Sequence, residues 1–369
     1  MRKQTVLLVM GTRPEVIKTA PVISALKKTP GLHPILIGTG QHRSLLDQML
    51  HSFSLSLDEN MRLMRPGQSP TDILSKGITR LTACFQHRRP ALVLVQGDTT
   101  SALAGALAAF HLKIPVGHIE AGLRSGDLSQ PFPEEMNRSV IDDIARLHFA
   151  PTQNNARTLI REGAAKSSVF ITGNTVVDSV KTLLKKKLAI RNPKARQFST
   201  GAGRKILLTA HRRESFGVPL QNIFGAISDL VKTHEDLRIL YPIHPNPEVH
   251  RAAKRRLTHP RITLCDPLDY FDFLKTAQAA DLIMSDSGGV QEEAPTLKTP
   301  IVVLRNITER GELIARNGWG KLSGTNRTKI VRDASSFLKR RKKTNRAPNP
   351  FGDGRSGPRI AAIIKRWLS

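Results

Sequence analysis

Residues 5–15 read TVLLVM-GTRPE, an apolar run that stops at a cluster of glycine, polar and charged residues. The same change recurs where ALVLV precedes QGDTT at 96–100, KILLTA precedes HRRE at 211–214, and LIM precedes SDSGG at 285–289. Short buried strands that end in polar loops are typical of open parallel α/β sheets, in which ligands bind beyond the carboxyl ends of the strands. The pattern predicts one shared active site built from strand ends.

Strand-like runs alternate with helical stretches, such as 16–28, 100–111 and 218–233, in two series separated by a basic, Gly-containing linker at 180–204. We expect strands at 5–10, 34–37, 91–95, 114–119, 147–150 and 169–172, and then at 205–210, 237–243, 261–265, 281–285 and 300–304. This alternation favours right-handed βαβ units and parallel sheets. The chain of 369 residues is therefore expected to form two doubly wound α/β domains, with an amphipathic helix at 358–369 packed on the body.

The formal net charge is +27, with basic residues concentrated at 185–196, 250–256 and 339–343. A nucleic-acid-binding protein is the alternative that this charge raises. The basic stretches contain almost no aromatic residues and match no nucleic-acid-binding module, so we interpret them as solvated surfaces without a specific nucleic-acid partner.

The two cysteines, Cys84 and Cys265, are far apart and lie among apolar residues, which favours buried thiols in a reducing compartment. The N-terminal apolar run lacks a signal-peptide cleavage pattern, and no stretch approaches the ~20 apolar residues that span a bilayer. We expect a cytoplasmic protein without membrane insertion.

Two strand-to-helix turns have the composition of anion sites. Ser287-Gly288-Gly289 allows close backbone approach at a helix start, where amides favour phosphate. In the first turn, Arg13 and Lys18 are able to reach anionic oxygens. The chain has neither the dinucleotide fingerprint nor a P-loop, so these turns predict a diphosphate guest without assigning its class.

Carboxylates also follow the predicted strands. Asp98, Glu120 and the pair Glu134-Glu135 would supply the two or more acid/base groups that proton transfer at carbon needs. A helix cap is the structural alternative for Asp98. In the second half, His211, His244 and several arginines suit a diphosphate clamp, and the absence of a His-x-x-x-His pair favours chemistry without a metal.

The chain resembles the non-hydrolysing UDP-N-acetylglucosamine 2-epimerases over most of its length. The matching motifs are GTRPEVIK (11–18), GQHRSLLDQ (40–48), QGDTTSALA (96–104), HIEAGLRSGD (118–127), PFPEEMNR (131–138), ITGNTVVD (171–178), TAHRRESFG (209–217), PIHPNP (242–247), DSGGVQEEAP (286–295), ITERGE (307–312) and NPFGDG (349–354). The resemblance implies a GT-B fold, in which two Rossmann-like doubly wound parallel-sheet domains face a cleft. We expect an N-terminal domain of 1–175 with 351–369 returning as a helix, and a UDP-binding domain of 176–350.

The implied activity is the interconversion of UDP-N-acetylglucosamine and UDP-N-acetylmannosamine for cell-surface polysaccharide precursors, by elimination of UDP to 2-acetamidoglucal and re-addition. A hydrolysing 2-epimerase, an epimerase of a related UDP-2,3-diacetamido sugar and a GT-B glycosyltransferase are the alternatives. The lack of a dinucleotide fingerprint and of a metal-ligand pair predicts no cofactor, and the resemblance implies a homodimer. A second UDP-N-acetylglucosamine can act as its activator.

The roles that the resemblance implies fall on matching positions of this sequence. The catalytic residues are Asp98, Glu120, Glu134 and His211. Substrate contacts fall on Arg13, Lys18, Phe273, Ser287, Gly288, Gly289, Glu293 and Arg310, and His211 also matches a nucleotide contact. Activator contacts fall on Gln41, Gln68, Arg212 and His244.

Overall fold

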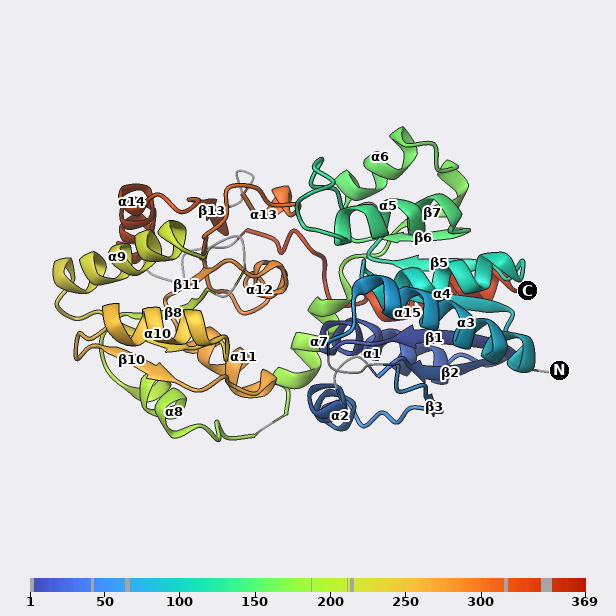
Figure 1. Ribbon diagram of the computed structural model, residues 1–369, viewed down its shortest axis with the longest axis horizontal. Coiled ribbons are helices and arrows are strands. Elements are labelled where there is room, and N and C mark those ends of the chain that lie inside the picture. Colours follow the sequence, from blue (N-terminus) through green and yellow to red (C-terminus); the bar gives the residue numbers. More distant parts are fainter. Residues whose placement is uncertain are drawn as a thin grey trace. The chain divides into compact units, whose positions relative to one another are not determined.

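The computed structural model in Figure 1 describes residues 3–40, 43–63, 67–186, 188–210, 212, 216–314, 318–339 and 347–369. The chain divides into two units, of which the first comprises Met1–Ser179 and Phe351–Ser369 and the second comprises Val180–Pro350. Each unit is a parallel sheet with helices on both faces (Figure 1). The predicted fold class, a pair of doubly wound parallel-sheet domains of the GT-B type, is confirmed.

The sheet of the first unit has the order β3-β2-β1-β4-β5-β6-β7, and its strands pair in parallel throughout the described residues. Its elements are β1 (Gln4–Met10), α1 (Arg13–Lys27), β2 (Leu32–Gly38), α2 (Arg43–Ser52), β3 (Glu59–Asn60), α3 (Pro70–Arg88), β4 (Leu92–Gln96), α4 (Thr100–His111), β5 (Val116–Ile119), α5 (Glu134–Ile144), β6 (Leu147–Ala150), α6 (Gln153–Arg161), a 3₁₀ turn (Lys166–Ser168), β7 (Val169–Ile171), α7 (Thr175–Leu184) and α15 (Ser356–Trp367). The strand order reverses between β1 and β4, and ligands of such sheets bind at this reversal.

The second unit repeats the plan with the order β10-β9-β8-β11-β12-β13. Its elements are α8 (Pro193–Thr200), β8 (Lys205–Thr209), α9 (Val218–Thr233), β9 (Arg238–Pro242), α10 (Pro247–Arg256), β10 (Ile262–Cys265), α11 (Tyr270–Ala279), β11 (Leu282–Ser285), α12 (Gly288–Glu293), β12 (Ile301–Val303), α13 (Gly311–Ile314), β13 (Gly320–Leu322) and α14 (Arg327–Leu338). Here the order reverses between β8 and β11, so the loops after these two strands are neighbours.

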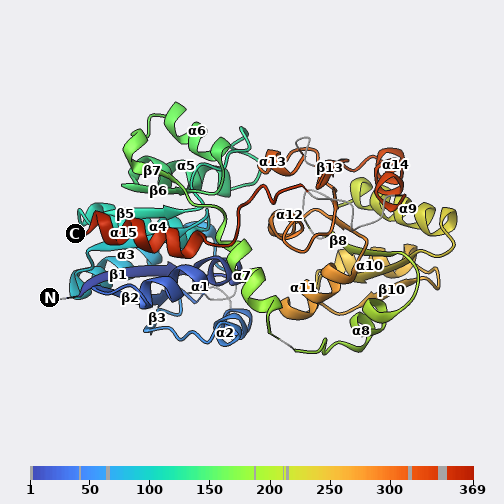
Figure 2. The same cartoon turned by 180° about the vertical axis from the view of Figure 1, so that it is seen from behind.

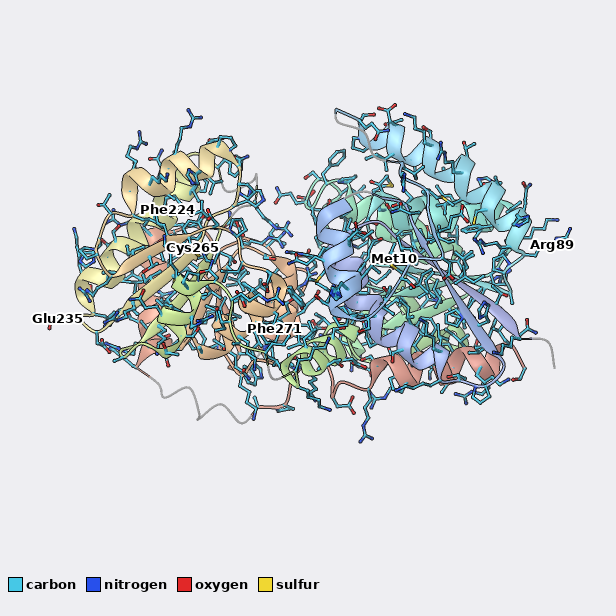
Figure 3. All side chains as sticks on the ribbon, turned by 90° about the horizontal axis from the view of Figure 1, so that it is seen from below. Met10, Arg89, Phe224, Glu235, Cys265 and Phe271 are labelled. Atoms are coloured by element: carbon cyan, nitrogen blue, oxygen red, sulfur yellow. The ribbon has the colours of Figure 1, made fainter. Side chains whose placement is uncertain are left out.

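The central strands are buried on both faces, which explains why they read as continuous apolar runs. Met10 is fully buried at the end of β1, and Phe224 is fully buried on α9. Figure 3 shows both side chains within their units, whereas Arg89 and Glu235 extend at the periphery. No helix among the described residues has the length and apolar character needed to cross a membrane.

Helix α15 returns to the first unit and lies along α1, and it is drawn in red in Figure 2. The Asp178 carboxylate accepts hydrogen bonds from the backbone N–H groups of Ser356 and Gly357 at 3.2 and 3.0 Å. A Cβ at Gly357 would lie 2.5 Å from the Pro21 carbonyl oxygen, so glycine permits this close contact. Ile360 is buried as the amphipathic pattern requires, but Trp367 is exposed.

The stretch predicted as a linker, 180–204, contains helix α8. Asn192 caps this helix, and the buried Asp272 carboxylate on α11 accepts hydrogen bonds from the Arg191 and Asn192 backbone amides. The linker interpretation was wrong for this part because the packing that orders a basic, Pro-containing segment is provided by a helix eighty residues away.

Candidate active site

In the first unit, the loops after β1, β4 and β5 leave the sheet from three adjacent strands. The first of these loops leads into α1, which carries the predicted residues Arg13 and Lys18, and the other two loops carry Asp98 and Glu120. Glu134 is the first residue of α5, and this helix packs against α4. The topology therefore gathers the predicted first-half residues at one edge of this sheet.

Glu15 joins two of these loops, although it was not predicted as a site residue. Its buried carboxylate accepts hydrogen bonds from the backbone amides of Gly11 (3.0 Å) and Thr12 (2.7 Å) and from the Thr12 hydroxyl (2.7 Å). The hydroxyl of Thr99, the cap of α4, donates to its other oxygen at 2.8 Å. The first loop is thereby anchored to the loop after β4.

Glu120 occupies the turn after β5 with a φ of +72°, a conformation that strains a non-glycine residue and is concentrated at functional sites. Its side chain is buried and forms an ion pair with Lys18 on α1. The Gln96 amide at the end of β4 donates to the same carboxylate at 3.1 Å. Because side chains from both α1 and β4 contact it, the Glu120 carboxylate has a defined position.

Asp98 follows β4 and forms an ion pair with Arg138 on α5. Arg138 also contacts the Glu135 carboxylate at 3.0 Å, and the Asn137 amide donates to the Asp98 carbonyl oxygen at 2.8 Å. Asp98 is therefore held by the same helix that begins with Glu134. The cap that we considered for α4 is provided by Thr99 rather than by Asp98.

A buried charged cluster lies beside these carboxylates. His118 on β5 contacts Asp142 on α5 through Nδ1 at 2.6 Å and the Gly97 carbonyl oxygen through Nε2 at 2.8 Å. Arg124 contacts the other oxygen of Asp142 at 2.8 Å. Burial raises the pKa of Asp142, but the charges of His118 and Arg124 outweigh it and leave the pKa below its ordinary value.

In the second unit, β11 ends at Ser285, whose hydroxyl lies 2.6 Å from that of Thr209 at the end of β8 and accepts a hydrogen bond from the Ser287 amide at 3.0 Å. Helix α12 then starts at Gly288. A Cβ at Gly288 would lie 2.9 Å from the Arg310 guanidinium, so glycine lets Arg310 lie directly against the helix start. At Gly289 a Cβ would meet no atom within 4 Å.

Two carboxylates hold Arg310 in place. Its guanidinium contacts Glu292 at 2.7 Å and Glu309 at 2.8 Å, and Arg305 contacts the second oxygen of Glu309 at 3.0 Å. All four side chains are buried. The cluster fixes the guanidinium beside the Ser287-Gly288-Gly289 turn.

Glu293, at the end of α12, accepts a hydrogen bond from the Tyr270 hydroxyl at 2.7 Å. Phe273 lies one turn after Tyr270 on α11 and is half-buried. The second unit thus brings Ser287, Gly288, Gly289, Glu293 and Arg310 together, with Phe273 on the adjacent helix.

The four predicted activator contacts lie in different parts of the chain. Gln41, like the predicted catalytic residue His211, lies outside the described residues. Gln68 is in the first unit, just before α3. Arg212 and His244 are in the second unit, where the Arg212 amide donates to the Asp286 carboxylate at 2.9 Å.

The sequence analysis did not predict the residues that form hydrogen bonds and ion pairs with the candidate site residues and their loops. Glu15 had a readable signal, because Thr12-x-x-Glu15 has the spacing of a capping box. Arg138 and Asp142 belong to α5, but Arg138 contacts Asp98, 40 residues away, and Asp142 contacts His118 on β5, 24 residues away. No local sequence pattern predicts contacts between residues so far apart in the chain.

A family model, a curated relative and a solved structure that match this chain agree on one enzyme family. The family model for UDP-N-acetylglucosamine 2-epimerase matches residues 24–365. The UDP-N-acetylglucosamine 2-epimerase of Escherichia coli O157:H7 is 43% identical, with 98% of each chain covered. The S. aureus MnaA–UDP structure superposes with a TM-score of 0.92 at 41% identity, covering 99% of this chain and 97% of that one. The Neisseria meningitidis UDP-GlcNAc 2-epimerase bound to UDP-GlcNAc has a TM-score of 0.92 at 38% identity, covering 98% and 100%.

Proposed function

The chain belongs to the UDP-N-acetylglucosamine 2-epimerase family, and from this we propose that it interconverts UDP-N-acetylglucosamine and UDP-N-acetylmannosamine without net hydrolysis. The observation that carries the proposal is the pair of carboxylates, Asp98 and Glu120, held by Arg138 and Lys18 at adjacent strand ends. Structures of related enzymes contain UDP-GlcNAc or UDP, which supports the nucleotide-sugar substrate.

The chemistry begins with loss of UDP because carbon 2 of the sugar is not adjacent to a carbonyl group. A base removes the proton from carbon 2, a double bond forms between carbons 1 and 2, and the carbon 1–oxygen bond breaks with its electron pair leaving on UDP. The intermediate is 2-acetamidoglucal. An acid then protonates carbon 2 on the opposite face, and UDP oxygen re-forms the bond to carbon 1.

Removal and return on opposite faces need more than one acid/base group. We assign this work to Asp98, Glu120 and Glu134, with His211 as a further catalytic residue. Lys18 and Arg138 form ion pairs with two of these carboxylates, Glu120 and Asp98. Arg13, at the first helical position after β1, would contact the substrate from the same edge.

The second unit supplies the site for UDP in this proposal. Arg310 and the amides after Ser287 would take the diphosphate, and loss of one such donor typically costs about 3–4 kcal/mol of transition-state stabilisation. Glu293 and Phe273 would contact the nucleoside. Tyr270 supports this assignment by orienting the Glu293 carboxylate.

Incubation with UDP-N-acetylglucosamine in deuterated water tests the reaction. A non-hydrolysing epimerase incorporates deuterium at carbon 2 of recovered nucleotide sugar and produces UDP-N-acetylmannosamine. Free N-acetylmannosamine with stoichiometric UDP would instead identify a hydrolysing enzyme, and absence of both isotope exchange and new products would reject the proposal.

We further propose that the protein is a cytoplasmic homodimer and that its product is used for cell-surface polysaccharide precursors. We also propose that a second UDP-N-acetylglucosamine activates it by binding to Gln41, Gln68, Arg212 and His244. The buried free thiols of Cys84 and Cys265 support a reducing compartment. Light scattering tests the dimer. Sigmoidal dependence of rate on substrate, made hyperbolic by Gln68→Ala, tests the activator.

A further inference from the structure

His118 lies between two of the loops that carry the proposed acids. Its Nε2 faces the carbonyl oxygen of Gly97, the residue before Asp98, and its Nδ1 faces the Asp142 carboxylate. The Gly97 carbonyl oxygen can only accept, so Nε2 is the donor in that hydrogen bond. His118 is completely buried, and these two bonds fix its orientation.

The second oxygen of Asp142 reaches the other loop. It accepts a hydrogen bond from the Gly122 amide at 3.1 Å, two residues beyond Glu120. Arg124, in the same loop, contacts this oxygen at 2.8 Å. One histidine–aspartate pair therefore connects the backbone beside Asp98 to the backbone beside Glu120.

We propose that His118 and Asp142 are positioning residues that hold the Gly97–Asp98 and Glu120–Gly122 backbones at the separation that proton transfer requires. This inference rests on the proposed function. Neither side chain is assigned contact with the substrate. A displacement of about 1 Å in such a site can cost about 10²-fold in rate, so the backbone bonds are expected to affect turnover more than substrate affinity.

The chain provides a matched control in His148, which is paired with His118 in the register of β5 and β6. It is also buried. Its Nε2 contacts the Asp142 carbonyl oxygen at 2.9 Å, and its Nδ1 contacts the Ser168 hydroxyl at 3.2 Å. His148 is thus buried like His118 and contacts the backbone of Asp142, but its ring bonds neither to the Asp142 carboxylate nor to the two acid loops.

Three variants distinguish an effect on the position of the acid loops from an effect on the stability of the fold. His118→Gln keeps a donor near Nε2 for Gly97, whereas His118→Asn keeps one near Nδ1 for Asp142 and loses the Gly97 bond. We expect His118→Asn to lower kcat about 10- to 100-fold with KM within about threefold, and His118→Gln to recover part of that loss. His148→Gln should lower Tm comparably and leave kcat within about twofold.

Amide hydrogen exchange provides a readout that needs no turnover. Exchange in residues 97–98 and 120–122 should accelerate in His118→Asn and stay unchanged in His148→Gln. Unchanged exchange, an unchanged kcat, or a kcat loss that follows Tm equally in all three variants would overturn the proposal.

If His118→Asn does not fold, Arg124→Gln tests the same carboxylate from a side chain that is 14% exposed. It should lower kcat with KM kept, and an unaltered kcat would overturn the inference. Failure of the unsubstituted enzyme to epimerise rejects the proposed function instead, while the exchange measurement still decides whether the pair orders the two loops.

Discussion

At the scale of single residues, Glu120 combines a strained backbone, burial and a paired lysine. Glu120→Gln keeps the shape of the side chain but removes its ability to exchange a proton, so we expect kcat to fall about 10²- to 10⁴-fold. Binding of UDP, measured by calorimetry, should be retained because the proposed UDP contacts lie in the second unit. The exposed Asp143→Asn on α5 is the control. Turnover within tenfold of the unsubstituted chain would remove Glu120 from the mechanism.

Glu15 predicts a pH dependence of stability. Burial raises its pKa above the ordinary 4.5, although hydrogen bonds from Thr12, Thr99 and Gly11 oppose the shift. The native chain therefore binds this proton more tightly than the unfolded chain, and the stabilisation is complete below pH 4.5 and is lost as the pH rises through the folded-state pKa.

Glu15→Gln removes this titration. The free energy of unfolding of the unsubstituted chain relative to the variant should decrease from pH 4.5 upward, as measured by urea unfolding at about pH 4, 6 and 8. Glu235→Gln, which removes an exposed carboxylate, is the matched control. A constant difference for Glu15→Gln would contradict the raised pKa.

At the scale of elements, the start of α12 depends on the contact between Gly288 and Arg310. Gly288→Ala places a methyl group 2.9 Å from the guanidinium and must displace it. We expect UDP binding to weaken about tenfold or more, since a charge-assisted contact of about 1.5–3 kcal/mol is lost. Gly311→Ala, where a Cβ meets no atom within 4 Å, is the control. Equal UDP affinities in calorimetry would show that Arg310 does not bind the diphosphate.

At the scale of the whole molecule, the net charge of +27 should attract an anionic nucleotide sugar. Raising the salt concentration from about 20 to 500 mM should lower kcat/KM severalfold and leave kcat nearly constant, because screening weakens capture rather than chemistry. Steady-state kinetics at several NaCl concentrations measure this, with sucrose as a viscosity control. A kcat/KM that is independent of salt would show that the charge serves no role in capture.

The sequence was sufficient to predict the two series of strands and helices, because buried parallel strands and amphipathic helices leave local periodicities. α4 and α9 lie at the predicted bounds. Strands β3 and β13 were missed because they read Glu-Asn and Gly-Lys-Leu and so lack the apolar run that marks the similarly short β7 and β12. The order in which polar loops follow apolar runs also indicated where the candidate residues gather.

What the sequence alone determined was which residue types stand at the strand ends, and hence the family and the expected chemistry. Only the tertiary structure decided which side chains form ion pairs with the candidate site residues. Arg138 pairs with Asp98, Lys18 pairs with Glu120, and Glu292 pairs with Arg310. Strand and helix patterns arise from interactions within a few residues, whereas these ion pairs join segments brought together by sheet order. Their geometry therefore exists only in the folded chain.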